Sequence, residues 1–521
     1  MGAGRYWPDG RRVGASGAGA MGYLKTFIGA AGFVLALCLA GAASAGPDLS
    51  AMSAGERIAF TKAMPKGGEL HNHISGAVFP EKLLAWAAED GRCVDVPKLA
   101  LAPPPCDRGG LRPAAEAIVD GELYSDLLDS FSTRQPGFLD RSGHDQFFGV
   151  FDRIGGLGPG RAGDMLAVVM DDLAHQNTFY LEAMITPQGG AAAALGLKVG
   201  LKDNLGQMKA EIDAAGLPAL VSAAIAGTDA LEARARQVLA CGTPAARPGC
   251  QVTVRYLVQT IRVLPPEATF AQLQLGVALV QADPRWVGLQ MVAPEDHPTA
   301  LANYSRHMEM VGFLTGRGQL APVALHAGEL TFDYAPPEHL RDHIAQAVRI
   351  AGARRIGHGV DLPHEIGAEA LAAEMARNGV LVEVNLTSNA VILELGPDDH
   401  PYEWLRERGV PVSLSTDDAG LLRIDLSHEY ERAHAYGATY DDLKRSARNA
   451  LAFSFLTGEG LWSDPGHYRR PADACRRQVG AAVPRGACAV LVESSDKARE
   501  QWRHEALLAA FEAAQRSAAR R

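Results

Sequence analysis

The chain has 521 residues, of which 47% are hydrophobic and 21% are charged, and its formal net charge is −10. This length and composition are typical of a globular protein with a large core, and they exclude a disordered or fibrous chain. The negative charge and the lack of a Lys/Arg-rich block argue against a general nucleic-acid binder. We therefore expect no nucleic-acid partner.

The first 45 residues have the features of an export signal. Lys25 precedes an apolar run over residues 27–40, which ends at the small-residue cleavage pattern Ala43-Ser44-Ala45. The run is shorter than a membrane span, so we predict a cleaved signal peptide and no stable membrane anchor. The protein is then expected to be exported, to the periplasm or the medium. Met21 is an alternative start, because residues 1–20 add nothing that a signal needs.

Eight apolar runs of strand length alternate with helical patterns along the rest of the chain. They are Gly68–His73, Phe179–Ile185, Val252–Gln259, Trp286–Val292, Pro322–His326, Arg355–His358, Val380–Asn385 and Pro411–Ser415. Such alternation predicts an α/β fold with a parallel sheet, and we expect a (β/α)8 TIM-type barrel. An open doubly wound sheet is the alternative, but no G-x-G-x-x-G follows the first run. One of the helices is predicted from Pro337 to Ala351, before Gly352.

Two segments do not fit a minimal barrel. Residues 92–135 include a Pro-Pro-Pro run and predict an inserted lobe after the first strand, within a barrel domain over residues 46–460. Residues 461–521 form a C-terminal extension, whose last helix we expect from Ser495 to about Ser517, covering the barrel. The sequence leaves the oligomeric state open; a homodimer is one hypothesis, with the inserted lobe as its interface.

Cysteine usage agrees with export. Beyond the signal segment there are six cysteines in three close pairs: Cys93 and Cys106, Cys241 and Cys250, Cys475 and Cys488. An even number of cysteines in an exported protein favours disulfides. We predict pairing within each close pair, although six cysteines allow about 15 connectivities.

The most informative motif is His71-x-His73. Side chains at i and i+2 of a strand point to the same face, so both imidazoles can bind one metal ion. Alone this spacing is weak, because a single histidine in an apolar strand is more often a core residue. Four further motifs follow predicted strands: His326-Ala327-Gly328-Glu329, Gly357-His358-Gly359, Thr387-Ser388-Asn389 and Ser415-Thr416-Asp417-Asp418. A barrel places its active site at these strand ends.

Three imidazoles and a carboxylate suit a borderline metal such as zinc. Bound zinc lowers the pKa of a water molecule toward about 7, and a neighbouring base then orients and deprotonates that water. Other interpretations exist for each motif: the Asp417-Asp418 pair and Ser388-Asn389 as helix caps, and His358 as a turn residue. All of these alternative interpretations would have to be correct at the same time, at four strand ends, so we favour the metal site.

In combination these motifs resemble the adenosine deaminase family. The matching segments are Pro65-Lys66-x-x-Glu69-Leu70-His71-x-His73-x-x-Gly76-Ala77, His326-Ala327-Gly328-Glu329, Arg355-Ile356-Gly357-His358-Gly359 and Ser415-Thr416-Asp417-Asp418. The resemblance covers about residues 60–460. An exported, disulfide-bearing form with an insertion is similar to the secreted adenosine deaminase-related growth factor branch. The resemblance implies a zinc-containing (β/α)8 barrel that hydrolyses the 6-amino group of adenosine, and of 2′-deoxyadenosine. Adenosine would give inosine and ammonia.

The resemblance also implies a role for each motif residue. One zinc ion per chain would be bound by His71, His73, His326 and Asp417. Glu329 would donate a proton to purine N1, and His358 would orient and deprotonate the zinc water. Asp418 would hydrogen-bond purine N7, and His73 would also border the substrate. Because Glu329 must be neutral to donate, we expect a raised pKa in the closed site.

Departures from the family pattern concern the substrate. Ser75 stands where classical members carry an Asp associated with the ribose, and Ala293 stands where a glycine contacts purine N3. Gln290 replaces the usual Asp, and Leu386 replaces a proline before Ser388-Asn389. These positions leave open how the sugar is bound, and so whether a free nucleoside is the preferred small-molecule substrate.

Three alternatives to adenosine deamination remain at this point. The first is a deaminase of another 6-aminopurine, such as adenine or a modified nucleoside. The second is a dinuclear amidohydrolase, which commonly needs a carboxylated lysine; Val252–Gln259 contains none. The third is an extracellular binding or signalling protein without catalysis. Cytidine-type zinc deaminases are excluded, because their His/Cys/Cys motifs do not occur here.

Overall fold

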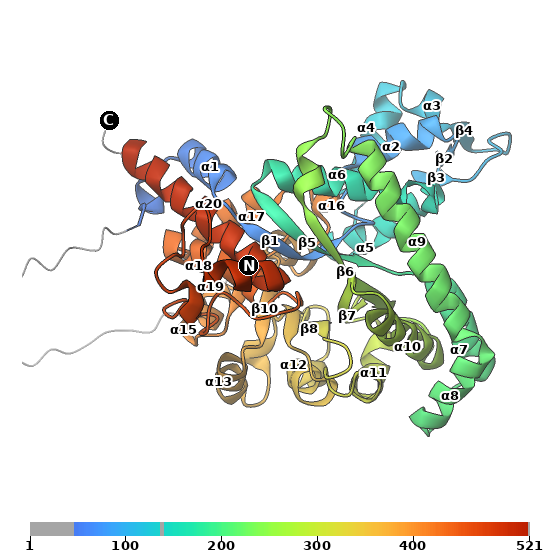
Figure 1. Ribbon diagram of the computed structural model, residues 1–521. Coiled ribbons are helices and arrows are strands. Elements are labelled where there is room, and N and C mark those ends of the chain that lie inside the picture. The colour runs from blue at the N-terminus through green and yellow to red at the C-terminus, as the bar shows by residue number, and fades with distance from the viewer. Residues whose placement is uncertain (1–45, 136–139, 519–521) are drawn as a thin grey trace, which may run out of the picture. The chain divides into compact units, whose positions relative to one another are not determined.

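The computed structural model describes residues 46–135 and 140–518, and the chain from Gly46 onward forms one compact unit (Figure 1). The predicted signal peptide at residues 1–45 lies outside the described residues. Export of the protein therefore stays a prediction.

Eight parallel strands make two four-stranded sheets. The first has the order β1-β5-β6-β7, with β1 Gly67–His73, β5 Thr178–Ile185, β6 Thr253–Ile261 and β7 Trp286–Val292. The second has the order β11-β10-β9-β8, with β8 Ala324–Ala327, β9 Arg355–His358, β10 Leu381–Val384 and β11 Val412–Leu414. All eight coincide with the predicted runs to within two residues at each end. They are readable in the sequence because parallel strands covered on both faces are continuously apolar.

The two sheets adjoin at both edges through isolated parallel bridges, Asn72 with Asp417 and Leu289 with Val323. The predicted α/β fold of eight parallel strands is confirmed, but no continuous ladder closes the barrel within the described residues. At the first seam Asp417 N–H donates to the carbonyl of His71 (3.0 Å), and His73 N–H donates to that of Asp417 (3.1 Å). Two motifs distant in sequence are thus held side by side by their own backbones.

Helices follow most strands and cover the outside of the sheets. They are α1 Ala54–Ala63, α6 Ala162–His175, α7 Gly189–Val199, α8 Leu205–Ala215, α9 Leu217–Val238, α10 Pro266–Ala282, α11 Pro298–Thr315, α13 Ala368–Asn378, α14 Leu386–Ile392, α15 Tyr402–Glu407, α16 Ala419–Leu422, α17 Leu426–Arg432 and α18 Tyr440–Ala452. Figure 1 shows α10, α11 and α13 in a row along one side of the strands. Within the described residues no single helix has the length and apolarity to cross a bilayer, although the bent pair α8–α9 meets both criteria jointly.

The helix predicted from Pro337 to Ala351 is wrong as one element. The segment forms a 3₁₀ turn at Pro337–Leu340, the short α12 at His343–Gln346 and a π-helical turn at Ala347–Ala351. The carboxylate of Glu365 accepts hydrogen bonds from the backbone N–H groups of Ile344 and Ala345. This distant side chain therefore caps a new helix start in the middle of the predicted one.

The segment predicted as an inserted lobe contains a small antiparallel sheet and two helices. They are β2 Cys93–Asp95, β3 Ala100–Ala102, β4 Leu111–Pro113, α3 Ala114–Ala117 and α4 Gly121–Ser130, between α2 Pro80–Glu89 and α5 Gly143–Ile154. Disulfides join Cys93 to Cys106, Cys241 to Cys250 and Cys475 to Cys488, which confirms the predicted pairing. A dimer interface at this lobe remains a prediction.

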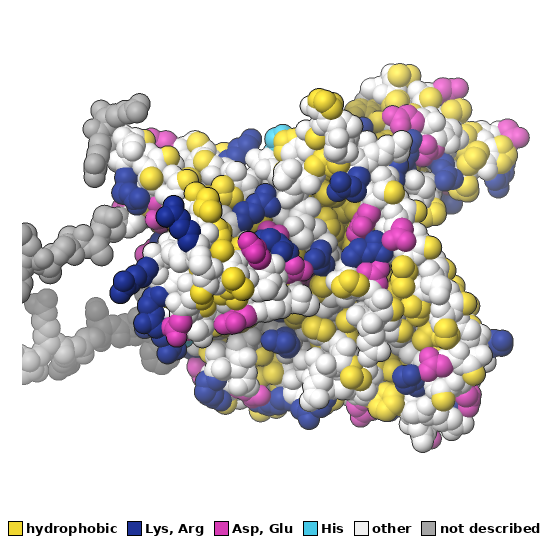
Figure 2. Space-filling model, viewed as in Figure 1, with side chains coloured by type: hydrophobic (Ala, Val, Ile, Leu, Met, Phe, Trp, Pro, Cys, Tyr) yellow, Lys and Arg dark blue, Asp and Glu magenta, His cyan; other side chains and the backbone are white. Residues whose placement is uncertain are grey.

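The C-terminal extension ends in α19 Ala487–Ser494 and α20 Asp496–Ala518, the second close to the predicted terminal helix. Helix α20 packs on α18 and β1, buries Trp502, and pairs Glu505 with Arg448 through two hydrogen bonds of 2.7 and 2.8 Å. The domain boundaries stay predictions. On the face of the molecule in Figure 2, basic and acidic side chains are interspersed among apolar ones.

Candidate metal site and substrate chamber

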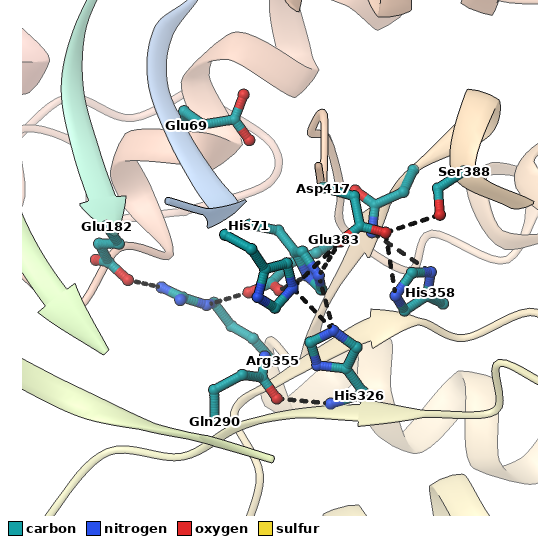
Figure 3. Close-up of polar contacts among 12 residues, drawn as sticks. Glu69, His71, Glu182, Gln290, His326, Arg355, His358, Glu383, Ser388 and Asp417 are labelled. Atoms are coloured by element: carbon teal, nitrogen blue, oxygen red, sulfur yellow. Dashed lines mark hydrogen bonds and ion pairs between the residues drawn. The ribbon is translucent and has the colours of Figure 1, made fainter. Parts of the chain in front are cut away.

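Three of the predicted ligand side chains, His71, His326 and Asp417, converge with His358 at the carboxyl ends of the strands (Figure 3). The fourth, His73, lies beside them with Asp417 and Asp418. Nε2 of His326 lies 3.1 Å from Nε2 of His71 and 3.3 Å from Nε2 of His73. Oδ1 of Asp417 lies 3.4 Å from Nε2 of His71 and 3.1 Å from Nε2 of His73. All four side chains are buried. Strands β1 and β8 and the turn after β11 thus direct four donor atoms at one point.

These spacings fit donor atoms that share one metal ion. Donor atoms about 2.0–2.1 Å from a zinc ion stand about 3.3–3.4 Å from each other, close to the four separations above. Imidazole nitrogens brought this close in a buried site share either a proton or a metal ion, because two lone pairs facing each other would repel. The donor set of three imidazoles and one carboxylate suits zinc. His358 borders the same cluster, but its Nε2 lies farther out, 4.0 Å from Oδ2 of Asp417.

Buried acceptors fix the tautomers of two of these histidines. Nδ1 of His71 lies 2.7 Å from Glu383, and Nδ1 of His73 lies 2.8 Å from Oε1 of Gln259. Each Nδ1 therefore carries the proton, and each Nε2 is free to bind a metal. Glu383 also accepts from Arg355 at 2.6 Å, and Arg355 contacts Glu182 at 2.7 Å, as Figure 3 shows.

Sequence reasoning missed this supporting network. Arg355, Glu383 and Glu182 are fully buried in apolar strands, and that placement was the available signal. A charged residue inside an apolar strand has to pair or serve a site. Gln290, noted only as a departure from the family, accepts from the backbone N–H of His326 at 2.7 Å and so positions that ligand.

Close approach around the ligands requires two glycines. A Cβ on Gly357 would stand 2.7 Å from Cε1 of His71, and a Cβ on Gly76 would stand 1.7 Å from Oδ1 of Asp418. Ser388 donates to Oδ2 of Asp417 at 2.7 Å and orients that carboxylate. The turn residues of these motifs are therefore dictated by space.

Glu329 follows β8. Its backbone N–H is hydrogen-bonded, whereas one oxygen of its carboxyl group lacks a hydrogen bond within the described residues. Glu295 accepts from its N–H at 3.1 Å, whereas Oε1 of Glu329 has no hydrogen-bond partner among the described residues. Burial, with the nearby carboxylates of Asp417 and Glu295, raises the pKa of Glu329 well above its usual value. The side chain is therefore a neutral acid, as expected from the sequence. Nδ1 of His358 lies 3.4 Å from Oε1 of Glu329, and burial lowers the pKa of His358 to about 3.

A cavity of about 500 Å³ opens in front of this cluster. Its lining residues are His73, Ser75, Phe147, Phe148, Phe151, Asp152, Gln259, Ile261, Val263, Val292, Ala293, Pro294, His326, Glu329, His358, Asp417 and Asp418. We call it the substrate chamber. All predicted site residues line it except His71, which lies behind the other ligands and is fully buried.

Two features of the chamber were not predicted from the sequence: its apolar wall, and a described lining without a basic residue. One wall is the apolar face of α5, with Phe147, Phe148 and Phe151, and its polar edge ends at Asp152. Within the described residues, the lining contains no lysine or arginine.

At the base of the chamber, burial and the neighbouring Asp417 raise the pKa of Asp418 well above its usual value. A neutral Asp418 can donate a hydrogen bond to a ring nitrogen.

The backbone of Ala293 has φ +83°, a conformation that favours glycine, in the place where the family carries one. We expect Ala293→Gly to raise the free energy of unfolding by about 1 kcal/mol, because the left-handed strain is released. We also expect a lower KM for the purine, since a methyl group leaves the chamber wall. Denaturant unfolding and steady-state kinetics check both effects. A variant that is less stable and has a higher KM would contradict this explanation.

A parallel α/β fold that gathers histidines and an aspartate at its strand ends is typical of metal-dependent hydrolases. The sequence pattern of the adenosine deaminase family matches residues 165–460. An adenine deaminase from Rhizobium meliloti (strain 1021) is 26% identical over 396 residues, which cover 75% of this chain and 94% of that protein.

Two solved structures share the fold. The Arabidopsis N6-mAMP deaminase matches with a TM-score of 0.50 at 20% identity, over 77% of this chain and 96% of that one. A zinc-bound amidohydrolase from Burkholderia ambifaria matches with a TM-score of 0.50 at 19% identity, over 79% and 92%. This chain belongs to the adenosine deaminase family.

Proposed function

We propose that the protein is a zinc-dependent deaminase of 6-aminopurines, with adenosine and 2′-deoxyadenosine as preferred substrates. The observation that carries this proposal is the convergence of four metal-binding atoms beside a buried Glu329, whose Oε1 has no hydrogen-bond partner among the described residues, in the wall of the substrate chamber. We propose His71, His73, His326 and Asp417 as the ligands of one zinc ion per chain. The ion would supply a water molecule activated as a nucleophile at neutral pH.

The residues of the chain account for the remaining chemistry. Glu329 gives its proton to purine N1 as the water oxygen bonds to C6, so the ring does not have to hold a negative charge. Asp418 donates to N7 and sets the orientation of the purine. The new C6 hydroxyl passes its proton to the C6 amino group, which leaves as ammonia as the C6=O bond forms. Glu329 then regains from the solvent a proton equivalent to the one that the water released there on activation. The apolar wall on α5 excludes bulk water from the chamber.

The chamber favours a free nucleoside over a nucleotide. A 5′-phosphate would meet no cation among the described lining residues, and Asp152 at the rim would repel it. We expect kcat/KM for adenosine to exceed that for AMP by about 5-fold or more, since Asp152 is exposed and a like-charge contact at the surface costs about 1 kcal/mol. Ammonia release from a panel of adenosine, 2′-deoxyadenosine, adenine and AMP measures this directly. Asp152→Lys is the matched variant, and it should bring kcat/KM for AMP closer to that for adenosine. Equal kcat/KM for AMP and adenosine in the wild type would contradict the preference for a nucleoside.

Adenine is the second candidate substrate. It is favoured by the adenine deaminase that aligns over 94% of its own length, and by Ser75, which stands in place of the family's ribose-associated Asp. Against it, the 500 Å³ chamber extends beyond a purine base to Asp152. Strong turnover of adenine with little activity on adenosine would assign the protein to this second function.

We also propose that the protein acts outside the cytoplasm, as in the secreted growth factor branch of the family. Three disulfides support this proposal, because they persist in oxidising compartments. Fractionation of cells that produce the full chain, followed by N-terminal sequencing of the mature protein, tests it. Retention in the cytoplasm with an uncleaved N-terminus would contradict it.

A further inference from the structure

A line of hydrogen bonds leads from the backbone of α15 to His358. The N–H of Tyr402 donates to Nδ1 of His400 at 3.1 Å. Nε2 of His400 lies 3.0 Å from Oδ1 of Asn389, and Nδ2 of Asn389 lies 2.9 Å from Nδ1 of His358. All four residues are buried, and His400 does not line the substrate chamber. The chamber histidine is thus connected to a second histidine behind it.

The contact between Tyr402 and His400 determines which atom donates in each hydrogen bond of this line. A backbone N–H can only donate, so Nδ1 of His400 is an acceptor and the ring proton is on Nε2. Burial lowers the pKa of His400 to about 3, which leaves the ring with a single proton. Nε2 of His400 then donates to Oδ1 of Asn389. The opposite orientation of that amide would require His400 to accept at both nitrogens, which a neutral imidazole cannot do.

The amide nitrogen of Asn389 faces Nδ1 of His358 at 2.9 Å, and that of Asn385 lies farther from the same atom, at 3.4 Å. Nδ1 of His358 is therefore an acceptor, and only Nε2 can carry the proton. We propose that His400 is a positioning residue that acts through Asn389 to hold His358 in its Nε2-protonated tautomer. Nε2 of His358 has no hydrogen-bond partner among the described residues and lies 4.0 Å from Oδ2 of Asp417. The effect on rate rests on the proposed function.

The tautomer decides what His358 contributes. With a proton on Nε2, it donates a hydrogen bond to the attacking oxygen, and this bond strengthens as negative charge develops there. The sequence-based expectation that resting His358 deprotonates the water does not fit this tautomer. In the Ser-His-Asp triad, a histidine held in the wrong tautomer loses about 10⁴-fold in kcat, so the device can have a large effect.

Four variants separate positioning from packing. His400→Leu removes the donor to Asn389, whereas His400→Gln keeps an amide N–H for Asn389 and an oxygen for Tyr402. Asn389→Asp replaces the amide donor with a carboxylate acceptor. The carboxylate accepts from Nδ1 of His358, so the ring proton moves to Nδ1. His504→Leu is the control for loss of a buried imidazole. His504 lies in α20, and within the described residues its one hydrogen bond is to the carbonyl of Pro65, at 3.2 Å.

The test combines ¹⁵N NMR of histidine-labelled, zinc-loaded full-length protein with kcat and KM for adenosine. Signals of His358 are assigned by their loss in His358→Gln. We expect Nε2 protonation in the wild type, in His400→Gln and in His504→Leu. We expect Nδ1 protonation in Asn389→Asp and a mixture in His400→Leu. The kcat should fall about 10- to 100-fold in His400→Leu and further in Asn389→Asp, with KM little changed.

A wild-type His358 protonated at Nδ1 would overturn the proposal, as would identical tautomers in the wild type and His400→Leu. Equal losses of kcat in His400→Leu and His504→Leu would assign the effect to packing and overturn it as well. The NMR measurement needs no turnover. Failure of the proposed reaction and failure of the positioning line therefore give different results.

Discussion

Replacing Glu329 with glutamine is expected to lower kcat for adenosine by about 10²- to 10⁴-fold, the usual contribution of a general acid. The amide keeps the shape of the side chain and its anchored backbone, but it has no acidic proton to give to N1. KM should change little, because the purine is still contacted by Asp418 and the apolar wall. Steady-state kinetics together with zinc content measure the effect, and the variant should retain one metal ion per chain.

The pH dependence of wild-type activity is a second test of Glu329 as the proton donor. Burial raises the pKa of Glu329, so the acid is protonated at neutral pH and ionises only as the pH rises through that raised value. Activity should therefore fall on the alkaline side, and Glu329→Gln should lack that fall in its residual rate.

Glu69→Gln provides the matched control for this substitution. Glu69 is also fully buried, and burial raises its pKa to about 8, so at neutral pH it is mostly neutral like the amide that replaces it. Figure 3 shows its carboxyl group apart from the ligand cluster. Full activity in Glu329→Gln, or an equal loss in Glu69→Gln, would show that Glu329 is not the proton donor.

The sequence was most informative where chemistry and local geometry are adjacent in the chain. His71-x-His73 and the motifs ending at Glu329, His358 and Asp418 could be found because ligands cluster at strand ends in short, glycine-bearing turns. The eight strands were visible as apolar runs for a related reason, since both faces of each are covered.

Residues whose role depends on a partner distant in the chain were not visible. Glu383 serves His71 across 312 positions, and Glu365 starts a helix 20 positions before itself. His400 reaches His358 only through Asn389. Each contact exists because the fold brings two elements together, and no local pattern encodes it.

The substrate wall was missed for the same reason. Phe147, Phe148 and Phe151 read as an ordinary apolar helix face in the sequence. Only the arrangement of α5 over the strand ends gives that face a chamber to line. The substrate preference is therefore argued from space and charge, whereas the metal site could be proposed from residue types alone.

Removing the metal should abolish turnover, and Glu383→Gln should weaken zinc binding by about 10- to 100-fold, the usual cost of losing a partner of a metal-ligating histidine. Glu383 contacts both Nδ1 of His71 and Arg355, and all three side chains are fully buried. A glutamine can accept one of these hydrogen bonds but brings no negative charge. Zinc is measured by competition with a chromophoric chelator, and activity should return on adding zinc to the chelated wild type.

Metal binding should also weaken as the pH falls. Burial acts to lower the pKa of His71, but hydrogen bonds with Asp417 and Glu383 outweigh it and raise that pKa to about 10 in the metal-free site. Protons therefore compete with the metal for this ligand, and binding releases them. Glu383→Gln removes one cause of the raised pKa, so its zinc affinity should depend less steeply on pH than that of the wild type.

Glu69→Gln again serves as the control. Glu69 lies in β1, two residues before His71, and its Oε1 accepts from the backbone N–H of Thr416 at 3.2 Å, but it does not contact a ligand ring. Its zinc affinity should equal that of the wild type. Thermal stability gives a second measure, because a ligand present at 100 times its Kd stabilises the folded state by about 2.7 kcal/mol. Activity that survives complete removal of metal would show that the reaction does not depend on it. Unchanged zinc affinity in Glu383→Gln would show instead that His71 does not need its buried carboxylate.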